Sequence, residues 1–177
     1  MNISIEQIKP KELSDDIRDL VRVGLGDTYA ENIKSVTKEN NVLLVAKSDG
    51  KPVGFACGYD GEDPTEYLSM DVDVEANSLL EKNAVHPDFR GEGIGTLLTE
   101  ERLKRLEQST IAESWMRTGS PDSTIILEKL GFKLVRKEED RWYDESVEAG
   151  DPNFCPDCGK VCYCDCAVYI LNRYEDN

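Results

Sequence analysis

The stretch that decides the fold is "AVHPDFRGEGIGTLL", residues 84–98. A strand-like run ends at a proline, glycines follow at positions 91, 93 and 95, and a helix with periodic apolar residues begins at once. Glycines let backbone amides approach a ligand closely, and the helix N-terminus adds the positive end of its dipole. The turn therefore predicts an anion site suited to a pyrophosphate, although a glycine-rich connection without a ligand has the same composition.

Two other phosphate-binding turns do not fit this stretch. A dinucleotide-binding turn requires an early strand-helix-strand unit with an acidic residue at the end of its second strand, and that setting is missing. A P-loop requires Gly-Lys followed by Ser or Thr, and these residues do not occur in the turn.

Hydrophobic periodicity predicts alternating strands and helices on both sides of the turn. Strands are expected over 3–8, on both sides of a hairpin turn at 48–51, and over 68–74, 78–85, 110–116, 132–137 and 167–173. Helices are expected over 12–25, 93–109 and 120–130, and the buried stripe of the second comprises Ile94, Leu97, Leu98, Leu103 and Leu106. The predicted fold class is α/β, with a mixed central sheet flanked by helices.

Length and charge limit the alternatives. A chain of 177 residues suits a single domain over 1–177. The 36 acidic and 21 basic residues give a net charge of -15 without a basic block, which argues against nucleic acid or a membrane as partner. The longest apolar run, 42–46, is too short for a membrane span, so a cytoplasmic protein is expected. The sole histidine, His86, is interpreted as a polar loop residue rather than a catalytic base.

The turn resembles the acyl-CoA-binding motif of the GNAT superfamily of N-acetyltransferases, Gln/Arg-x-x-Gly-x-Gly/Ala, and "LEKLGF" at 127–132 is similar to the end of the family's second motif. The resemblance implies the GNAT fold with acetyl-CoA as cosubstrate. It also implies that the pantetheine arm pairs with backbone at Ala84 and Val85, between the strands 78–85 and 110–116. The implied pyrophosphate contacts are Arg90, Gly91, Glu92, Gly93, Ile94, Gly95 and Thr96.

The second motif departs from the family pattern. Ser120 stands where family members often carry an Asn that contacts the cofactor, and it can still form a hydrogen bond. Leu127 stands where they carry a Tyr that protonates the leaving thiolate, and it cannot donate a proton. Tyr143 is the candidate acid. The alternative is that the thiolate leaves unassisted, since its thiol has a pKa of about 8.5.

Two carboxylates are candidate bases for deprotonating an acceptor amine. Glu81 and Glu113 lie on the two strands that the resemblance places beside the thioester. The alternative for each is an exposed strand residue without a catalytic role, because such carboxylates are commonly solvated.

The cysteine segment, "CPDCGKVCYCDC" at 155–166, holds five of the six cysteines. Closely spaced cysteines in a reducing compartment are more often metal ligands than disulfides, and Cys155-x-x-Cys158-Gly is typical of a zinc knuckle. The preferred ligands for one structural Zn²⁺ are Cys155, Cys158, Cys164 and Cys166, and a pair containing Cys162 is the alternative. A redox or metal-sensing role for the remaining thiol is a further interpretation.

The sequence thus predicts an N-acetyltransferase that moves acetyl from acetyl-CoA to a primary amine by direct attack in a ternary complex. The acceptor is a protein or peptide amine, because 131–143 is similar to enzymes that acetylate protein N-termini, or a small cationic amine, which suits the acidity. A Cys-rich insert, 144–166, precedes the last strand, on the side where the family binds acceptors. The alternative function is a catalytically weak CoA-binding or metal- and redox-sensing regulatory module.

Overall fold

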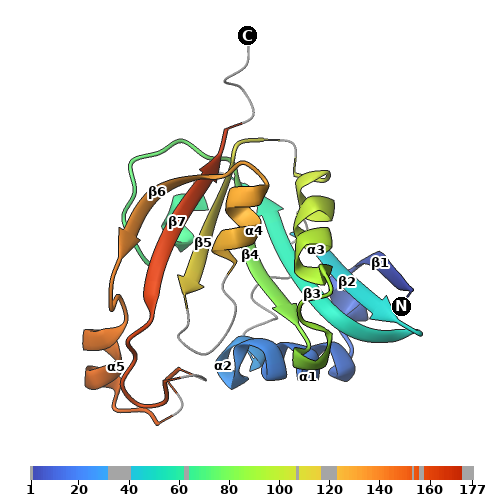
Figure 1. Cartoon of the computed structure of the whole chain (residues 1–177), viewed down its shortest axis with the longest axis horizontal. Helices are drawn as coiled ribbons and strands as arrows, with labels where there is room; N and C mark the ends of the chain where they lie inside the picture. Colours follow the sequence, from blue (N-terminus) through green and yellow to red (C-terminus); the bar gives the residue numbers. More distant parts are fainter. Residues whose placement is uncertain are drawn as a thin grey trace. The chain divides into compact units, whose positions relative to one another are not determined.

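The computed structural model describes residues 2–31, 41–61, 64–106, 108–116, 123–152, 154, 155 and 158–172. The chain forms two compact units. The first comprises Met1–Glu62 and Asn77–Gln108, and the second comprises Asp63–Ala76 and Ser109–Asn177. Figure 1 shows strands and helices along the whole described chain, which confirms the predicted α/β class.

The first unit is built on four antiparallel strands in the order β1-β2-β3-β4. Their bounds are Ile3–Ile8, Asn41–Ser48, Lys51–Asp60 and Ser78–Val85, and the unit's helices are η1 (Pro10–Glu12), α1 (Asp15–Leu25), α2 (Asp27–Glu31), η4 (Pro87–Phe89) and α3 (Ile94–Leu103). The predicted hairpin is confirmed: Asp49 and Gly50 join β2 to β3 with φ values of 49° and 79°. Left-handed residues in this place match the twist of the flanking strands.

The side-chain period of two gives this sheet two apolar faces. Leu43 and Val45 of β2 lie in one buried cluster with Phe55 and Cys57 of β3 and with residues of α1. The opposite face meets α3, since a Cβ placed on Gly54 would lie 2.9 Å from Leu98 and 3.0 Å from Ile94. The sheet therefore separates α1 from α3, and α3 is fixed on it by packing.

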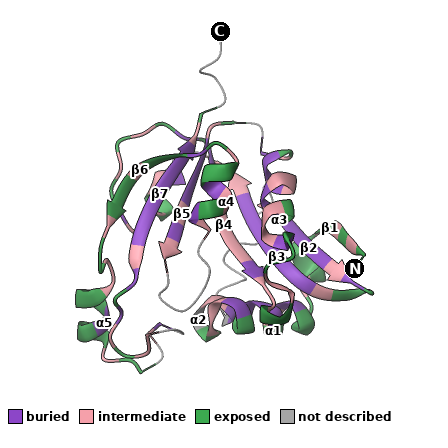
Figure 2. Cartoon of the chain, in the orientation of Figure 1, coloured by how far each residue is buried: buried purple, intermediate pink, exposed green. Residues whose placement is uncertain are grey.

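The second unit has three antiparallel strands in the order β5-β7-β6. These are β5 (Thr110–Met116), β6 (Lys133–Glu138) and β7 (Asp165–Leu171), with η3 (Pro64–Tyr67), α4 (Thr124–Lys129) and α5 (Tyr143–Ala149). Figure 2 shows β7 mostly buried and β6 largely exposed or half-buried, as expected for a central and an edge strand. Within the described ranges, no helix is both long enough and apolar enough to cross a membrane.

The strand predicted over 68–74 is wrong. After η3 the chain is irregular up to the start of β4, although Met70 is buried as its alternating pattern suggested. The backbone there is held by side chains instead of a strand ladder: Ser69 N donates to Glu113 at 2.6 Å, and Arg136 donates to the Asp71 carbonyl at 2.7 Å. Alternation predicted the burial correctly, but it could not show that no strand lies alongside.

The predicted stripe of α3 is wrong at one position. Leu97 is 42% exposed, whereas Ile94, Leu98, Leu103 and Leu106 are buried. Arg102 is 2% exposed and therefore belongs to the buried stripe, which was predicted to contain only apolar residues. It lies four residues after Leu98 and eight after Ile94, so helical spacing already placed it on the buried side.

Candidate functional site

The glycine turn between β4 and α3 has the geometry of an anion site. Gly91 and Gly93 have φ values of 81° and 79°. A Cβ on either would meet nothing within 4 Å, so the backbone conformation, and not lack of space, requires glycine. Gly93 is the N-cap of the ten-residue helix α3, and Leu97 N donates to the Gly93 carbonyl at 3.0 Å. The amides before Leu97 have no intrahelical acceptor and are available to a ligand.

The other predicted cofactor residues surround this turn. Arg90 Nε donates to the Val85 carbonyl at 3.2 Å, so the side chain ties the turn back to the end of β4. Ala84 and Ile94 are each 1% exposed and can contribute only backbone groups. Glu92 is exposed. His86 accepts a hydrogen bond from Asp88 N at 3.3 Å and caps η4, as expected of a polar loop residue. Ser120 lies outside the described residues.

A buried polar group behind the turn was missed by sequence reasoning. The Arg102 guanidinium donates to the carbonyls of Cys57 and Lys82 at 2.9 and 3.1 Å. Burial lowers the pKa of Arg102 to about 10, so the side chain is still charged at neutral pH. Burial, and after it the nearby Glu81 carboxylate, raises the pKa of the Cys57 thiol to about 12.

The two candidate bases lie in different surroundings, Glu81 in the first unit and Glu113 in the second. Glu81 is ion-paired with Lys82 Nζ at 2.6 Å. Glu113 Oε2 accepts from Ser69 N at 2.6 Å and from Ser69 Oγ at 2.8 Å. Glu81 is thus bound to a cation, while Glu113 is held by neutral donors on one of its oxygens.

The candidate acid and the position of the family tyrosine are also in the second unit. Tyr143, the first residue of α5, is 41% exposed, and its ring lies 5.4 Å from that of Tyr163 between centroids. Leu127 of α4 is 3% exposed and belongs to the core. At that position the chain has a packing residue, which cannot donate a proton.

The cysteine segment gathers four thiols. The sulfurs of Cys155, Cys158, Cys162 and Cys164 all lie within 4.8 Å of one another. The Cys155 and Cys164 sulfurs are 3.8 Å apart and the Cys158 and Cys164 sulfurs 3.5 Å apart, and none of the six cysteines forms a disulfide. Three of the four residues are buried and Cys158 is half-buried. Four converging sulfurs that are not bonded to one another form a candidate metal centre.

Local backbone geometry brings the thiols together. Cys155 and Gly159 exchange two backbone hydrogen bonds, of 3.2 and 2.8 Å, and Gly159 has a left-handed φ of 77°. Cys158 N lies 3.4 Å from Cys155 Sγ, to which it donates. Cys162 N donates to the buried Ser146 Oγ at 2.9 Å, which fixes the second half of the segment to α5.

The preferred ligand set from the sequence differs from this group at one position. Cys166 is not among the four, and Cys162 takes its place, as in the alternative set. The reason is that β7 begins at Asp165, so Cys166 is a strand residue paired with Trp115 and Glu138. Its sulfur lies 3.6 Å from Ser69 Oγ instead.

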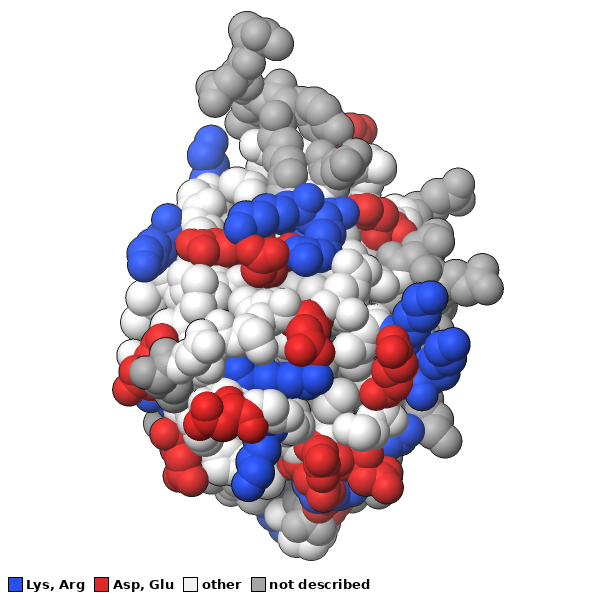
Figure 3. Space-filling view, turned by 90° about the vertical axis from the view of Figure 1, so that its right-hand side faces the viewer, with Lys and Arg blue, Asp and Glu red and all other residues white. Residues whose placement is uncertain are grey.

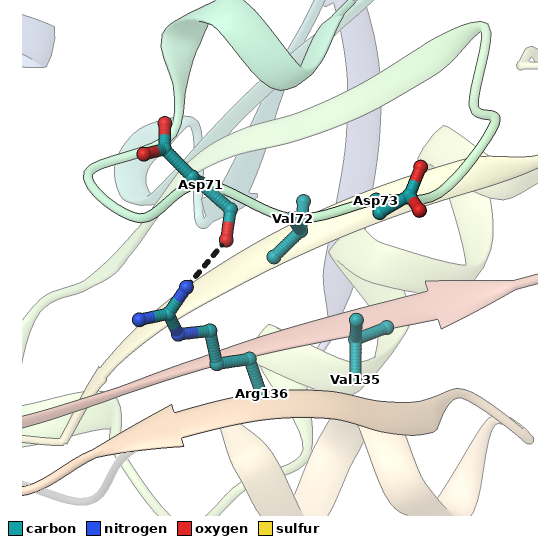
Figure 4. Close-up of a pocket in the computed structure, with 5 residues that line it drawn as sticks. All are labelled: Asp71, Val72, Asp73, Val135 and Arg136. Atoms are coloured by element: carbon teal, nitrogen blue, oxygen red, sulfur yellow. Dashed lines mark hydrogen bonds between the residues drawn. The ribbon is translucent and has the colours of Figure 1, made fainter.

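A separate groove in the second unit contains none of the predicted site residues. It is lined by Asp71, Val72, Asp73, Val135 and Arg136. Figure 4 shows the Arg136 guanidinium bonded to the Asp71 carbonyl while both carboxylates point away from it. Among the described residues on the face shown in Figure 3, acidic and basic side chains are interspersed.

The glycine turn at the start of α3 suits a cofactor that carries a pyrophosphate, and comparison with known proteins gives the family. Residues 39–134, more than half of the chain, match the model of the acetyltransferase (GNAT) domain. The chain belongs to the GNAT family of acetyltransferases.

Similar proteins agree with this assignment. An uncharacterized N-acetyltransferase from Archaeoglobus fulgidus is 34% identical over an alignment of 119 residues that covers 58% of this chain and 76% of the relative. The ribosomal-protein-S18-alanine N-acetyltransferase of Escherichia coli has a similar structure, with a TM-score of 0.68 and 17% identity over 99% of this chain and 98% of that one. The structure of the acetyltransferase yncA of Salmonella typhimurium, solved with its cofactor acetyl-CoA, is also similar. Its TM-score is 0.65 and its identity 15%, over 100% of this chain and 97% of that one. The structural likenesses show the predicted GNAT fold.

Proposed function

We propose that this protein is an acetyl-CoA-dependent N-acetyltransferase whose acceptor is a primary amine of a protein, a peptide or a small cation. The observation that carries the proposal is the turn with left-handed Gly91 and Gly93 at the start of α3, which presents backbone amides to a pyrophosphate. Two relatives named as N-acetyltransferases and a similar structure with bound acetyl-CoA support it. The predicted single domain over 1–177 is part of this proposal.

In the proposed reaction the neutral amine attacks the thioester carbonyl directly. A C–N bond forms, the C–S bond breaks, the amine nitrogen loses a proton to a base, and the CoA thiolate leaves and takes up a proton. Backbone amides near the end of β4, at Ala84 and Val85, are the proposed partners of the cofactor arm. One such donor on the developing oxyanion contributes about 3 kcal/mol in acyl transfer.

Of the two candidate bases, Glu113 is the better suited. Protonation of Glu81 would break its ion pair with Lys82, which lies at 2.6 Å. Glu113 has no cation bonded to it among the described residues, and both of its bonds from Ser69 use Oε2. Its Oε1 can accept a proton without loss of the bonds that orient the side chain.

The position where family members carry the acidic tyrosine is Leu127 in this chain, and Leu127 is buried. Tyr143 is the proposed proton donor, and its hydroxyl is on an exposed residue that a substrate can reach. Unassisted departure of the thiolate is the alternative, since a thiol of pKa about 8.5 is a tolerable leaving group.

The test is acetyl-CoA turnover with a panel of amines, followed by release of free thiol. We expect turnover with at least one amine, a fall in kcat of about 100-fold in E113Q, as for loss of general base catalysis, and a smaller fall in E81Q. The matched control is E6Q, because Glu6 is an exposed strand residue ion-paired with Lys47 at 2.6 Å. Binding of CoA without turnover across the panel would favour the regulatory alternative, and full activity of E113Q would remove Glu113 as the base.

We further propose that the cysteine segment binds one structural Zn²⁺ through Cys155, Cys158, Cys162 and Cys164. A tetrahedral zinc with Zn–S distances of about 2.3 Å holds its sulfurs about 3.8 Å apart. The Cys155–Cys164 and Cys158–Cys164 sulfur separations, 3.8 and 3.5 Å, are close to that value, and all four sulfurs lie within 4.8 Å of one another. Four thiolates leave no open coordination position, so the ion's chemistry is structural. Such a cluster suits a reducing compartment, and we place the enzyme in the cytoplasm.

The ligand set can be tested by zinc content. We expect one zinc per chain by elemental analysis of the purified protein. C162S should lose it, while C166S should retain it, because Cys166 lies outside the group. C57S is the matched control, since Cys57 is a buried strand residue of the first unit. Retention in C162S with loss in C166S would restore the ligand set preferred from the sequence.

A further inference from the structure

The strand β4 contains a bulge at Glu81. Cys57 of β3 pairs with Lys82, but the next residue of β3, Gly58, pairs with Leu80, so Glu81 is an extra residue in β4. A Cβ on Gly58 would lie 2.6 Å from the Leu79 carbonyl oxygen, which shows how closely the backbones approach there. A bulge interrupts the ladder and redirects the strand beyond it. Here that part is Lys82–Val85, which runs into the glycine turn.

Arg102 supplies the hydrogen bonds that the bulge removes from the ladder. Its Nη1 donates to the carbonyls of Cys57 and Lys82, at 2.9 and 3.1 Å, and these two residues are the pair next to the bulge. Among the described residues no carboxylate pairs with the guanidinium, and only its Nε lacks a hydrogen-bond partner. A buried charge without a counter-ion is costly unless hydrogen bonds compensate it, and Arg102 donates to three oxygen acceptors.

The same guanidinium is connected to the glycine turn. Arg102 Nη2 donates to Thr99 Oγ1 at 3.1 Å, and Thr99 Oγ1 donates to the Gly95 carbonyl at 2.9 Å. Asn83 of β4 joins this network, because its Nδ2 lies 3.3 Å from the Gly95 oxygen and 3.2 Å from Thr99 Oγ1. The network therefore links β4 beyond its bulge to the first turn of α3.

The geometry of the side chain explains why it is an arginine. A planar guanidinium presents several donors in a fixed fork, so one side chain can reach acceptors on β3, β4 and α3 together. A lysine carries a single ammonium on a flexible stem and cannot hold the same three acceptors with one geometry. An apolar residue would leave two buried carbonyls without these bonds.

We propose that Arg102 is a positioning residue of the acetyl-CoA site, which holds the bulged strand β4 and the glycine turn in the arrangement that binds the cofactor. The inference rests on the proposed binding of acetyl-CoA at this turn. It assigns to Arg102 no contact with the cofactor.

The test is calorimetric titration of CoA into the wild type, R102K, R102M and T99V. The dissociation constant reports the shape of the site in folded molecules, and the stoichiometry reports the folded fraction separately. We expect a loss of affinity of about tenfold in R102M, because two buried carbonyls lose a charged donor. We expect a loss of about threefold in R102K and T99V, which keep part of the network. KM for acetyl-CoA should rise in parallel, while KM for the acceptor stays unchanged.

The matched control is R105Q. Arg105 lies three residues further on, is ion-paired with Glu101 at 2.7 Å and is partly exposed, so its loss should leave the affinity for CoA unchanged. A purely structural role predicts reduced stoichiometry with wild-type affinity in all Arg102 variants, and that result would overturn the inference. If the wild type itself fails to bind CoA, the proposed function fails and the inference with it.

Discussion

The glycine turn and the cysteine segment are both irregular stretches of backbone, but different interactions stabilise them. The turn is attached to α3, whose Ile94 and Leu98 are almost fully buried against the sheet of the first unit, and it is fixed by the hydrogen bonds of Asn83 and Thr99. The cysteine segment has a small buried cluster made of the thiols themselves, with Trp115, Trp142 and Phe154 packed against it.

The difference predicts which part of the protein depends on the proposed zinc. Apolar packing and a hydrogen-bond network stabilise the turn without any ligand. A segment whose centre is four thiols gains little from burial alone, so we expect its order to depend on the proposed zinc. The proposed cofactor site should therefore be insensitive to metal, and the cysteine segment should require it.

Removal of the metal has the largest expected effect. Structural zinc contributes roughly 10–16 kcal/mol of apparent free energy in small zinc-binding peptides, far more than the packing of a short segment can replace. Chelation should abolish amide hydrogen-exchange protection over 154–166 while β2, β3 and β4 keep theirs. The chain's only two tryptophans, Trp115 and Trp142, lie against the cluster with rings 4.9 Å apart between centroids, so their fluorescence should change. An unchanged spectrum together with unchanged protection would contradict the dependence on metal.

A smaller effect is expected when the turn loses one glycine. Gly93 has a φ of 79°, and the left-handed conformation costs a residue with a Cβ roughly 1–2 kcal/mol. G93A should therefore weaken CoA binding about tenfold, as measured by calorimetry. Gly50 has the same φ of 79° in the β2-β3 hairpin, so G50A is the matched control. It should lower the melting temperature and leave CoA affinity unchanged; equal losses of affinity in both variants would mean that strain anywhere in the unit weakens the site.

The smallest effect concerns the sixth cysteine. Because the pKa of Cys57 is raised to about 12, chiefly by burial, its thiol is neutral at pH 8 and enclosed by the core. Iodoacetamide at pH 8 should leave Cys57 unmodified in the native protein, with or without metal, and should modify the cysteine segment only after chelation. Mass spectrometry of peptides measures both, and labelling of Cys57 after chelation would show that loss of metal also opens the first unit.

The sequence predicted the turn and its setting because local signals carried them. Glycines at 91 and 93 have the left-handed conformation that only glycine adopts readily, and the Asp49-Gly50 hairpin follows the same rule. Predictions were wrong where a side chain from elsewhere in the sequence decides the structure. The region around Ser69 alternates like a strand, but Glu113, Arg136 and Arg141 are its hydrogen-bond partners.

Two features of the proposed sites also depended on parts of the structure that the sequence did not reveal. Arg102 was on the buried side of its helix by spacing, but only the bulge at Glu81 provides the carbonyls that bind it, and a bulge has no sequence signal here. The choice between Cys162 and Cys166 depended on the residue at which β7 begins, and element boundaries are the least certain part of a sequence-based prediction.

The central claim is that the glycine turn of the first unit binds CoA without help from the proposed metal, which serves the cysteine segment. Its most direct test is the dissociation constant of CoA for the zinc-bound protein and for the same protein after chelation, with turnover of the best acceptor measured in parallel. Independent sites predict CoA affinities that are equal within about twofold in the two forms. The acceptor KM should be higher in the metal-free protein, because the Cys-rich insert is expected on the side where the family binds acceptors. A loss of CoA affinity of about tenfold or more on chelation would contradict the account.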